Sequence, residues 1–118
     1  MLDFFHTAAQ DAADNLDLAL PDLANGTLTE AALLDLLAAR VTYLLDGHLE
    51  QLLNVFYRLD ITEQRVDAAV ADDALAASGL DPAQALARLI LARHYEKLRT
   101  RIAYPQPPIE GLDEALKY

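Results

Sequence analysis

The clearest helix in this chain occupies residues 81–103, which read DPAQALARLILARHYEKLRTRIA. Asp81 stands at the N-cap position, Pro82 at the first helical position and Gln84 at the third, a combination typical of a helix start. The first half of the segment is apolar on nearly every side, whereas the second half keeps only a narrow apolar stripe. We therefore expect a long helix over 82–103 whose first half lies at the centre of the protein.

The composition favours helices along the rest of the chain. It includes 24 Leu and 22 Ala, which are strong helix formers, but only four Val and four Ile, which favour strands. Apolar residues recur at helical spacing in four further segments, over about 2–20, 27–46, 48–59 and 63–72. The sequence thus predicts an all-α protein. Its expected form is a compact bundle of four main helices plus one short helix, with the long C-terminal helix central.

Local signals place the ends of these helices. Pro21 disfavours the helical conformation at Leu20, so the first helix is expected to end there or one residue earlier. Thr27 and Thr29 compete to cap the second helix, and Thr62 is expected to cap the short one. Two segments are then expected to be loops, 21–27 and 73–81, and the second has room for one irregular turn over 73–77.

The length of 118 residues fits one domain, which we place at residues 1–104. Residues 105–118 form a separate C-terminal tail in this interpretation. Because Pro105, Pro107 and Pro108 cannot continue a helix, the tail is expected to leave the last helix and to be extended.

The composition also excludes several classes of function. The chain contains no cysteine, which rules out disulfides, thiolate metal sites and cysteine nucleophiles. Its formal net charge of −10 disfavours nucleic acid and anionic membrane, because affinity for phosphate comes mainly from Lys and Arg. No apolar run approaches the roughly 20 residues of a membrane span, and no secretory signal is recognisable. We therefore expect a cytoplasmic protein that binds neither nucleic acid nor membrane.

The three histidines do not form a recognisable ligand set. His6, His48 and His94 are far apart, and none has a second His four residues away, as helical zinc motifs require. Each is expected at the surface or at the edge of the core. Ser78 is the only serine and has no neighbouring His, which disfavours a serine nucleophile. The sequence therefore predicts no catalytic, cofactor-binding or metal-binding residue and no cofactor, and it favours a protein that is not an enzyme.

Charge is unevenly distributed along the chain. Residues 1–50 contain nine acids and one base, whereas residues 81–104 contain five bases and two acids. One interpretation is internal complementarity, with the last helix lying near the acidic first two. The other is a basic patch that recruits an acidic partner or a second subunit. Asp11, Asp14 and Asp17 lie opposite the apolar stripe of the first helix and are expected to face water.

The missing catalytic set and the segregated charge favour a non-enzymatic protein-interaction module, of which a homodimer is one form. Arg93, Lys97 and Arg101 share a side of the last helix at steps of four residues, with Leu86 and Ile90 on the same side. These five residues are the candidate interaction surface.

Two alternatives stay open. The first is a small-molecule-binding protein or enzyme with an apolar pocket near Tyr43, Tyr57 and Tyr95. The second is a helix-turn-helix nucleic-acid binder made by the third and fourth helical segments. It is disfavoured because its recognition helix would present Glu63 and Asp67 to phosphate.

Overall fold

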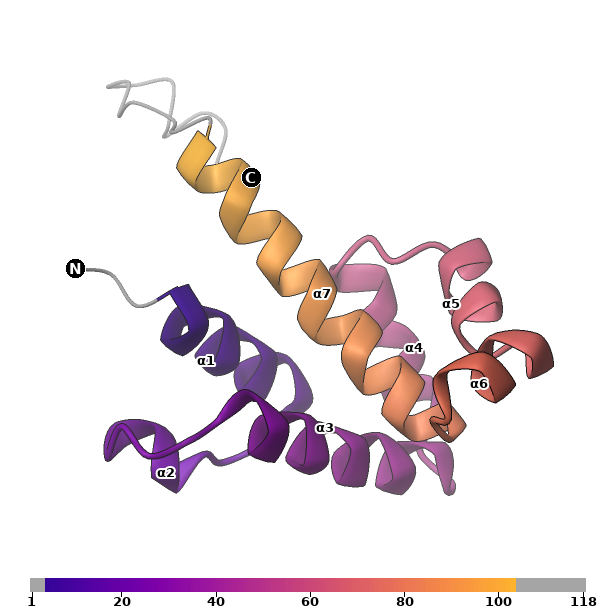
Figure 1. The fold of residues 1–118 in the computed structure, drawn as a ribbon, viewed down its shortest axis with the longest axis horizontal. Coiled ribbons are helices and arrows are strands. Elements are labelled where there is room, and N and C mark those ends of the chain that lie inside the picture. Colours follow the sequence, from indigo (N-terminus) through magenta and orange to yellow (C-terminus); the bar gives the residue numbers. More distant parts are fainter. Residues whose placement is uncertain (1–3, 104–118) are drawn as a thin grey trace.

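The computed structural model describes residues 4–103, and every regular element among them is a helix (Figure 1). The helices are α1 (Phe4–Leu16), α2 (Pro21–Ala24), α3 (Glu30–Leu45), α4 (Leu49–Arg58), α5 (Glu63–Ala69), α6 (Asp72–Ser78) and α7 (Pro82–Ala103). The all-α prediction is confirmed for this part of the chain. The expected Pro-containing tail lies outside the described residues.

The longest helix, α7, packs against α1, α3 and α5. In Figure 1 it runs diagonally, with α1 beside its C-terminal half and α3 crossing near its N-terminal half. Its apolar side chains enter the main core cluster, the largest being Leu86, Ile90, Leu91 and Leu98. Burial of each such side chain stabilises the fold by about 1.5–3 kcal/mol, so α7 is the common packing partner of α1, α3 and α5.

Small side chains bring α1 close to its neighbours. Helix α1 contacts both α3 and α7. Four of its alanines are completely buried: Ala8, Ala9, Ala12 and Ala13. Larger side chains from α3 fill the facing space: Leu33, Leu37, Val41 and Leu44. These four residues recur at helical spacing and form one buried stripe along α3.

Three helices begin at caps that the sequence identifies. The Thr29 hydroxyl accepts a hydrogen bond from the Ala32 amide, so Thr29 rather than Thr27 caps α3. Thr62 caps α5 in the same way. At α7 the Asp81 carboxylate accepts from the Gln84 amide at 2.8 Å, and the Gln84 side chain accepts from the Asp81 amide at 3.0 Å. This reciprocal pair is the expected capping box.

The first helix ends earlier than predicted, at Leu16 instead of Leu20. Asp17 adopts the left-handed conformation, with φ of 54°. The Leu18 amide then donates to the Ala13 carbonyl at 2.8 Å and the Asp17 amide to the Asp14 carbonyl at 3.3 Å. This is the Schellman pattern of a helix C-terminus, in which the reversed residue closes the last turn. Pro21 does not end the first helix but occupies the first position of α2.

Helix α4 ends with the same geometry. Asp60 has φ of 57°, the Ile61 amide donates to the Phe56 carbonyl at 2.9 Å, and the Asp60 amide donates to the Tyr57 carbonyl at 3.1 Å. Both helices therefore finish in a Leu-Asp-apolar sequence, with the aspartate in a conformation that Gly adopts more easily.

Arginines from distant helices bind the carbonyl groups left at these two ends. Arg40 Nε donates to the Leu16 carbonyl at 2.8 Å, and Arg93 Nε donates to the Leu59 carbonyl at 2.7 Å. A third bond runs from Arg58 Nη2 to the Asn15 carbonyl at 3.1 Å. Carbonyls in the last turn of a helix have no partner within it and carry partial negative charge, so a cation there is favourable.

Both segments expected to be loops contain a short helix. Within 21–27 lies α2, and within 73–81 lies most of α6. Asp72 and Asp73 occupy the first turn of α6, where negative charge is favourable, and Gly79 ends it with φ of 74°. The sequence carried these signals, but helices this short are not stable alone and need tertiary packing.

Replacing Asp17 by Gly should stabilise the protein. A non-Gly residue in the left-handed conformation destabilises the folded state by about 1–2 kcal/mol. Gly avoids this cost, but its greater freedom in the unfolded chain lowers the folding stability by about 0.5–1 kcal/mol. We therefore expect the free energy of unfolding of Asp17→Gly, measured with urea, to rise by roughly 0.5–1 kcal/mol.

Asp17→Ala is the matched control, since it removes the same charge and keeps the Cβ atom. It should not stabilise. Equal gains from Gly and Ala would show that the carboxylate, and not the backbone conformation, is the unfavourable feature of this position.

Candidate functional site

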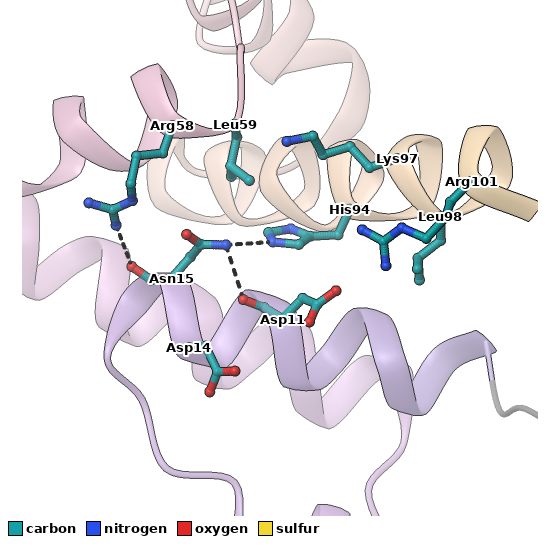
Figure 2. A pocket seen from close by; sticks show the side chains of 9 residues that line it. All are labelled: Asp11, Asp14, Asn15, Arg58, Leu59, His94, Lys97, Leu98 and Arg101. Atoms are coloured by element: carbon teal, nitrogen blue, oxygen red, sulfur yellow. Dashed lines mark hydrogen bonds between the residues drawn. The ribbon is translucent and has the colours of Figure 1, made fainter. Parts of the chain in front are cut away.

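A polar hollow lies where the end of α4 meets α1 and the second half of α7 (Figure 2). Its volume is about 430 Å³. Most of its lining side chains are charged or polar: Asp11, Asp14, Asn15, Arg58, Leu59, His94, Lys97, Leu98 and Arg101. We call it the α1–α7 hollow. A pocket of this size lies within the range of small-molecule sites, which is about 300–1,000 Å³.

His94 forms part of its wall. The sequence predicted this residue at the surface or at the edge of the core, but only 3% of it is exposed. Its Nδ1 lies 2.8 Å from the Ile90 carbonyl oxygen. Because a carbonyl only accepts, Nδ1 carries the proton in this contact. The sequence-based expectation was wrong because it considered only residues one turn away.

The second ring nitrogen of His94 completes a short network. Nε2 lies 3.1 Å from Asn15 Nδ2, which also donates to the Asp11 carbonyl at 3.1 Å (Figure 2). The amide nitrogen only donates, so Nε2 accepts, and the network fits a neutral imidazole protonated at Nδ1. The sequence analysis did not single out Asn15, nor did it single out Arg58, which also lines the hollow.

Burial lowers the pKa of His94 below its ordinary value of 6.5. The hydrogen bond to Ile90 and the charge of Asp11 oppose this effect, while the nearby Lys97 and Arg93 add to it. His94 is therefore neutral at pH 7 and serves as a fixed, uncharged part of the wall.

The charged groups of the hollow face one another without pairing. Among the described residues, Lys97 and Arg101 form no salt bridge, and the Asp11 carboxylate accepts no hydrogen bond. Asp14 accepts a hydrogen bond from Gln10 at 2.9 Å. The two cations and the free carboxylate are thus available to a ligand.

A second hollow of about 290 Å³ adjoins the first across the end of α1. Both are lined by Asp14, Asn15 and Arg58. Arg40 lies in the second one, where it binds the Leu16 carbonyl. The two arginines that bind carbonyls at the end of α1, Arg40 and Arg58, therefore both line this second hollow.

The candidate interaction surface on α7 is divided by the fold. Leu86 and Ile90 belong to the core and are not accessible. Arg93 binds the Leu59 carbonyl and Glu96, so its charge is already used. Only Lys97 and Arg101 stay together, and both line the α1–α7 hollow.

Glu96 joins two arginines. Arg65 of α5 binds both of its oxygens, at 3.1 and 3.0 Å, and Arg93 binds one at 3.2 Å. Hydrogen bonding from Arg65 is the main reason that the pKa of Glu96 is lowered. In the described part of the chain, the salt bridges of α7 therefore involve α5 and α7 itself, and none connects α7 to the acids of residues 4–50.

None of the hollows found among residues 4–103 and described here is lined by more than one of the three tyrosines of the alternative pocket. Tyr57 is 84% exposed. The Tyr43 ring stacks on His48 with centroids 4.4 Å apart. Tyr95 donates to Glu30 at 2.7 Å and lines a separate hollow of about 150 Å³. Its pKa is raised by burial and by the Glu30 contact.

Helix α4 carries an exposed apolar face that the sequence analysis did not separate from its buried one. Leu49, Leu53 and Tyr57 follow one another at steps of four residues and are 50%, 53% and 84% exposed. Apolar spacing over residues 48–59 therefore does not show by itself which leucines of α4 are buried. We call these three residues the outer face of α4. The buried side of α4 consists of other residues: Leu52, Val55 and Phe56.

The helix-turn-helix alternative concerns α4 and α5, which do follow one another through a short turn. However, α5 packs against α7, and its Arg65 is bound to Glu96. The remaining polar side chains of α5 are exposed, with the acids Glu63 and Asp67 among them.

Neither a metal-binding cluster nor a membrane-spanning element is found between residues 4 and 103. No group of three or more His, Asp and Glu side chains in this range could hold a metal ion. None of the helices there combines the length and apolar character needed to cross a bilayer.

The lowered pKa of His94 predicts a pH-dependent stability. The unfolded chain binds a proton at His94 near pH 6.5 and the folded chain only at lower pH, so stability is complete above pH 6.5 and falls below it. One proton limits the slope to about 1.4 kcal/mol per pH unit. We expect His94→Gln to flatten the dependence of unfolding free energy on pH just below 6.5, measured by urea denaturation.

Glu96→Gln is the control for this window. The Glu96 pKa is lowered from 4.5, so its contribution is lost only as the pH falls below about that value. The Glu96 variant should therefore keep the slope that the His94 variant loses. An unchanged slope in His94→Gln would mean that another group titrates there.

Comparison with known proteins gives no relative from which a role could be transferred. The chain matches no protein-family model, no curated protein and no solved structure. Its function is therefore inferred from the geometry of residues 4–103.

Proposed function

We propose that this chain is a non-enzymatic helical interaction module that binds a basic amphipathic helix of a partner protein on the outer face of α4. The observation that supports the proposal is the exposed row of Leu49, Leu53 and Tyr57 on a helix whose other side is in the core. An acidic chain without cysteines also suits the reducing cytoplasm, where we place it.

Three exposed apolar residues in a row differ from single ones. Isolated exposed leucines are common on soluble proteins and need no explanation. Residues at steps of four lie on successive turns of one helix face, which is the spacing by which helices recognise helices and grooves. Burial of half of a leucine side chain would contribute about 1 kcal/mol, so the outer face can support a moderate affinity.

The charge around the outer face favours a basic partner. Glu50 lies three residues before Leu53, beside the outer face on the helix surface, and is exposed. Arg58, the base of this helix, is bound to the Asn15 carbonyl. With a net charge of −10, two copies of the chain repel each other, whereas a Lys-rich helix is attracted.

A synthetic amphipathic helix made only of Leu and Lys tests this proposal. It should bind the full chain and change the backbone NMR signals of α4. Leu53→Asp should weaken binding about tenfold or more, since it removes apolar contact at the centre of the face. The fold should tolerate the change because Leu53 is 53% exposed.

Leu36→Asp is the matched control. Leu36 lies on α3, is 39% exposed, and gains the same charge in the variant. This variant should bind the peptide as well as the parent chain. Equal weakening by both variants, or binding of a Leu/Glu peptide with the same affinity, would contradict a specific face. A dimer in sedimentation that Leu53→Asp dissociates would instead identify a second copy as the occupant.

A further inference from the structure

We propose that the α1–α7 hollow binds a small zwitterion, with an ammonium group against Asp11 and a carboxylate against Lys97 and Arg101. This site is independent of the outer face of α4 and does not depend on its partner.

The charges of both signs carry the inference. Lys97 and Arg101 lie one turn apart on α7 and line the same hollow as Asp11 of α1. In Figure 2 the Asp11 carboxylate is directed toward the Arg101 guanidinium, and the Lys97 side chain extends along α7 toward Leu59. None of the three forms a salt bridge among the described residues. A ligand with an anionic and a cationic end can satisfy all three groups, whereas a simple anion would be placed near the Asp11 carboxylate.

The neutral wall of the hollow supports a polar ligand. Both donor positions of the Asn15 amide nitrogen are used, by His94 and by the Asp11 carbonyl, which fixes the amide group. Its oxygen has no hydrogen-bond donor among the described residues and points toward the Arg58 side of the hollow, where it can accept a hydrogen bond from a polar ligand (Figure 2). His94 is already bonded at both ring nitrogens and holds Asn15 in place.

Size restricts the ligand to a small molecule. A volume of about 430 Å³ accommodates an amino acid or a slightly longer ω-amino acid. Because the hollow is polar and partly exposed, the affinity should be modest, with a Kd on the order of 1 mM at low salt.

A series of ω-amino acids tests the proposal on the intact chain. Glycine, β-alanine, 4-aminobutyrate and 5-aminopentanoate separate the two charges by increasing lengths. Butyrate and butylamine carry one charge each and match 4-aminobutyrate in size. We expect one member of the series to shift the NMR signals of the His94 ring and the Asn15 side-chain amide. It should bind at least fivefold more tightly than butyrate or butylamine.

Single-site variants then separate the two charges. Asp11→Asn should remove the preference for the zwitterion, so that butyrate binds as tightly as the best ω-amino acid. Arg101→Gln should weaken the ω-amino acid and butyrate but not butylamine. Asp67→Asn, which removes an exposed acid on α5, is the matched control and should change nothing.

Two results would overturn the proposal. Tighter binding of butyrate than of every ω-amino acid would show a simple anion site. Unchanged His94 and Asn15 signals at ligand concentrations well above the expected Kd would show that the hollow binds none of these molecules. Neither result affects the peptide experiment on α4, whose signals and variants are different.

Discussion

The arrangement of this protein depends on arginine side chains that bind the last carbonyl groups of helices far away in the sequence. Arg40 of α3 binds Leu16 at the end of α1, and Arg93 of α7 binds Leu59 at the end of α4. Such carbonyls otherwise need water, and a charged donor gives a stronger bond than a neutral one. Each bond fixes the position at which one helix ends beside another. The packing of Leu and Ala is non-directional and does not fix this position by itself.

These two helix ends also create the polar hollow. When α1 stops at Leu16, Asn15 is placed beside His94, and when α4 stops at Leu59, that residue closes the other side. The left-handed aspartates at positions 17 and 60 make both stops possible. Polar groups thus gather where three helices meet, since helix ends bring their unsatisfied backbone groups there. The hollow is a consequence of the same contacts that stabilise the fold.

Much of the helical framework could be predicted from the sequence because its signals are local. The caps at Thr29, Thr62 and Asp81 are determined by residues three positions apart. The buried state of His94 could not be predicted in this way, because its partner Asn15 is 79 positions away. Arg93 was assigned to a surface for the same reason: its partner is a backbone carbonyl, which leaves no mark in a side-chain pattern. Periodicity likewise shows that α4 has a wide apolar arc but not which part of it the neighbouring helices cover.

The two candidate surfaces meet on one helix without sharing side chains. Successive residues of a helix are separated by about 100°, so Arg58 points well away from Leu53 and Tyr57. Arg58 lies at the hollow and binds α1, while the leucines face outward. A partner on the outer face therefore leaves the hollow open, and the two sites can influence each other only through a movement of α4 itself. Arg58 holds α4 to α1 and Arg93 holds it to α7 at the same end, so a movement of α4 would act on the hollow through these two bonds as well as through the packing of its buried side against α1 and α3.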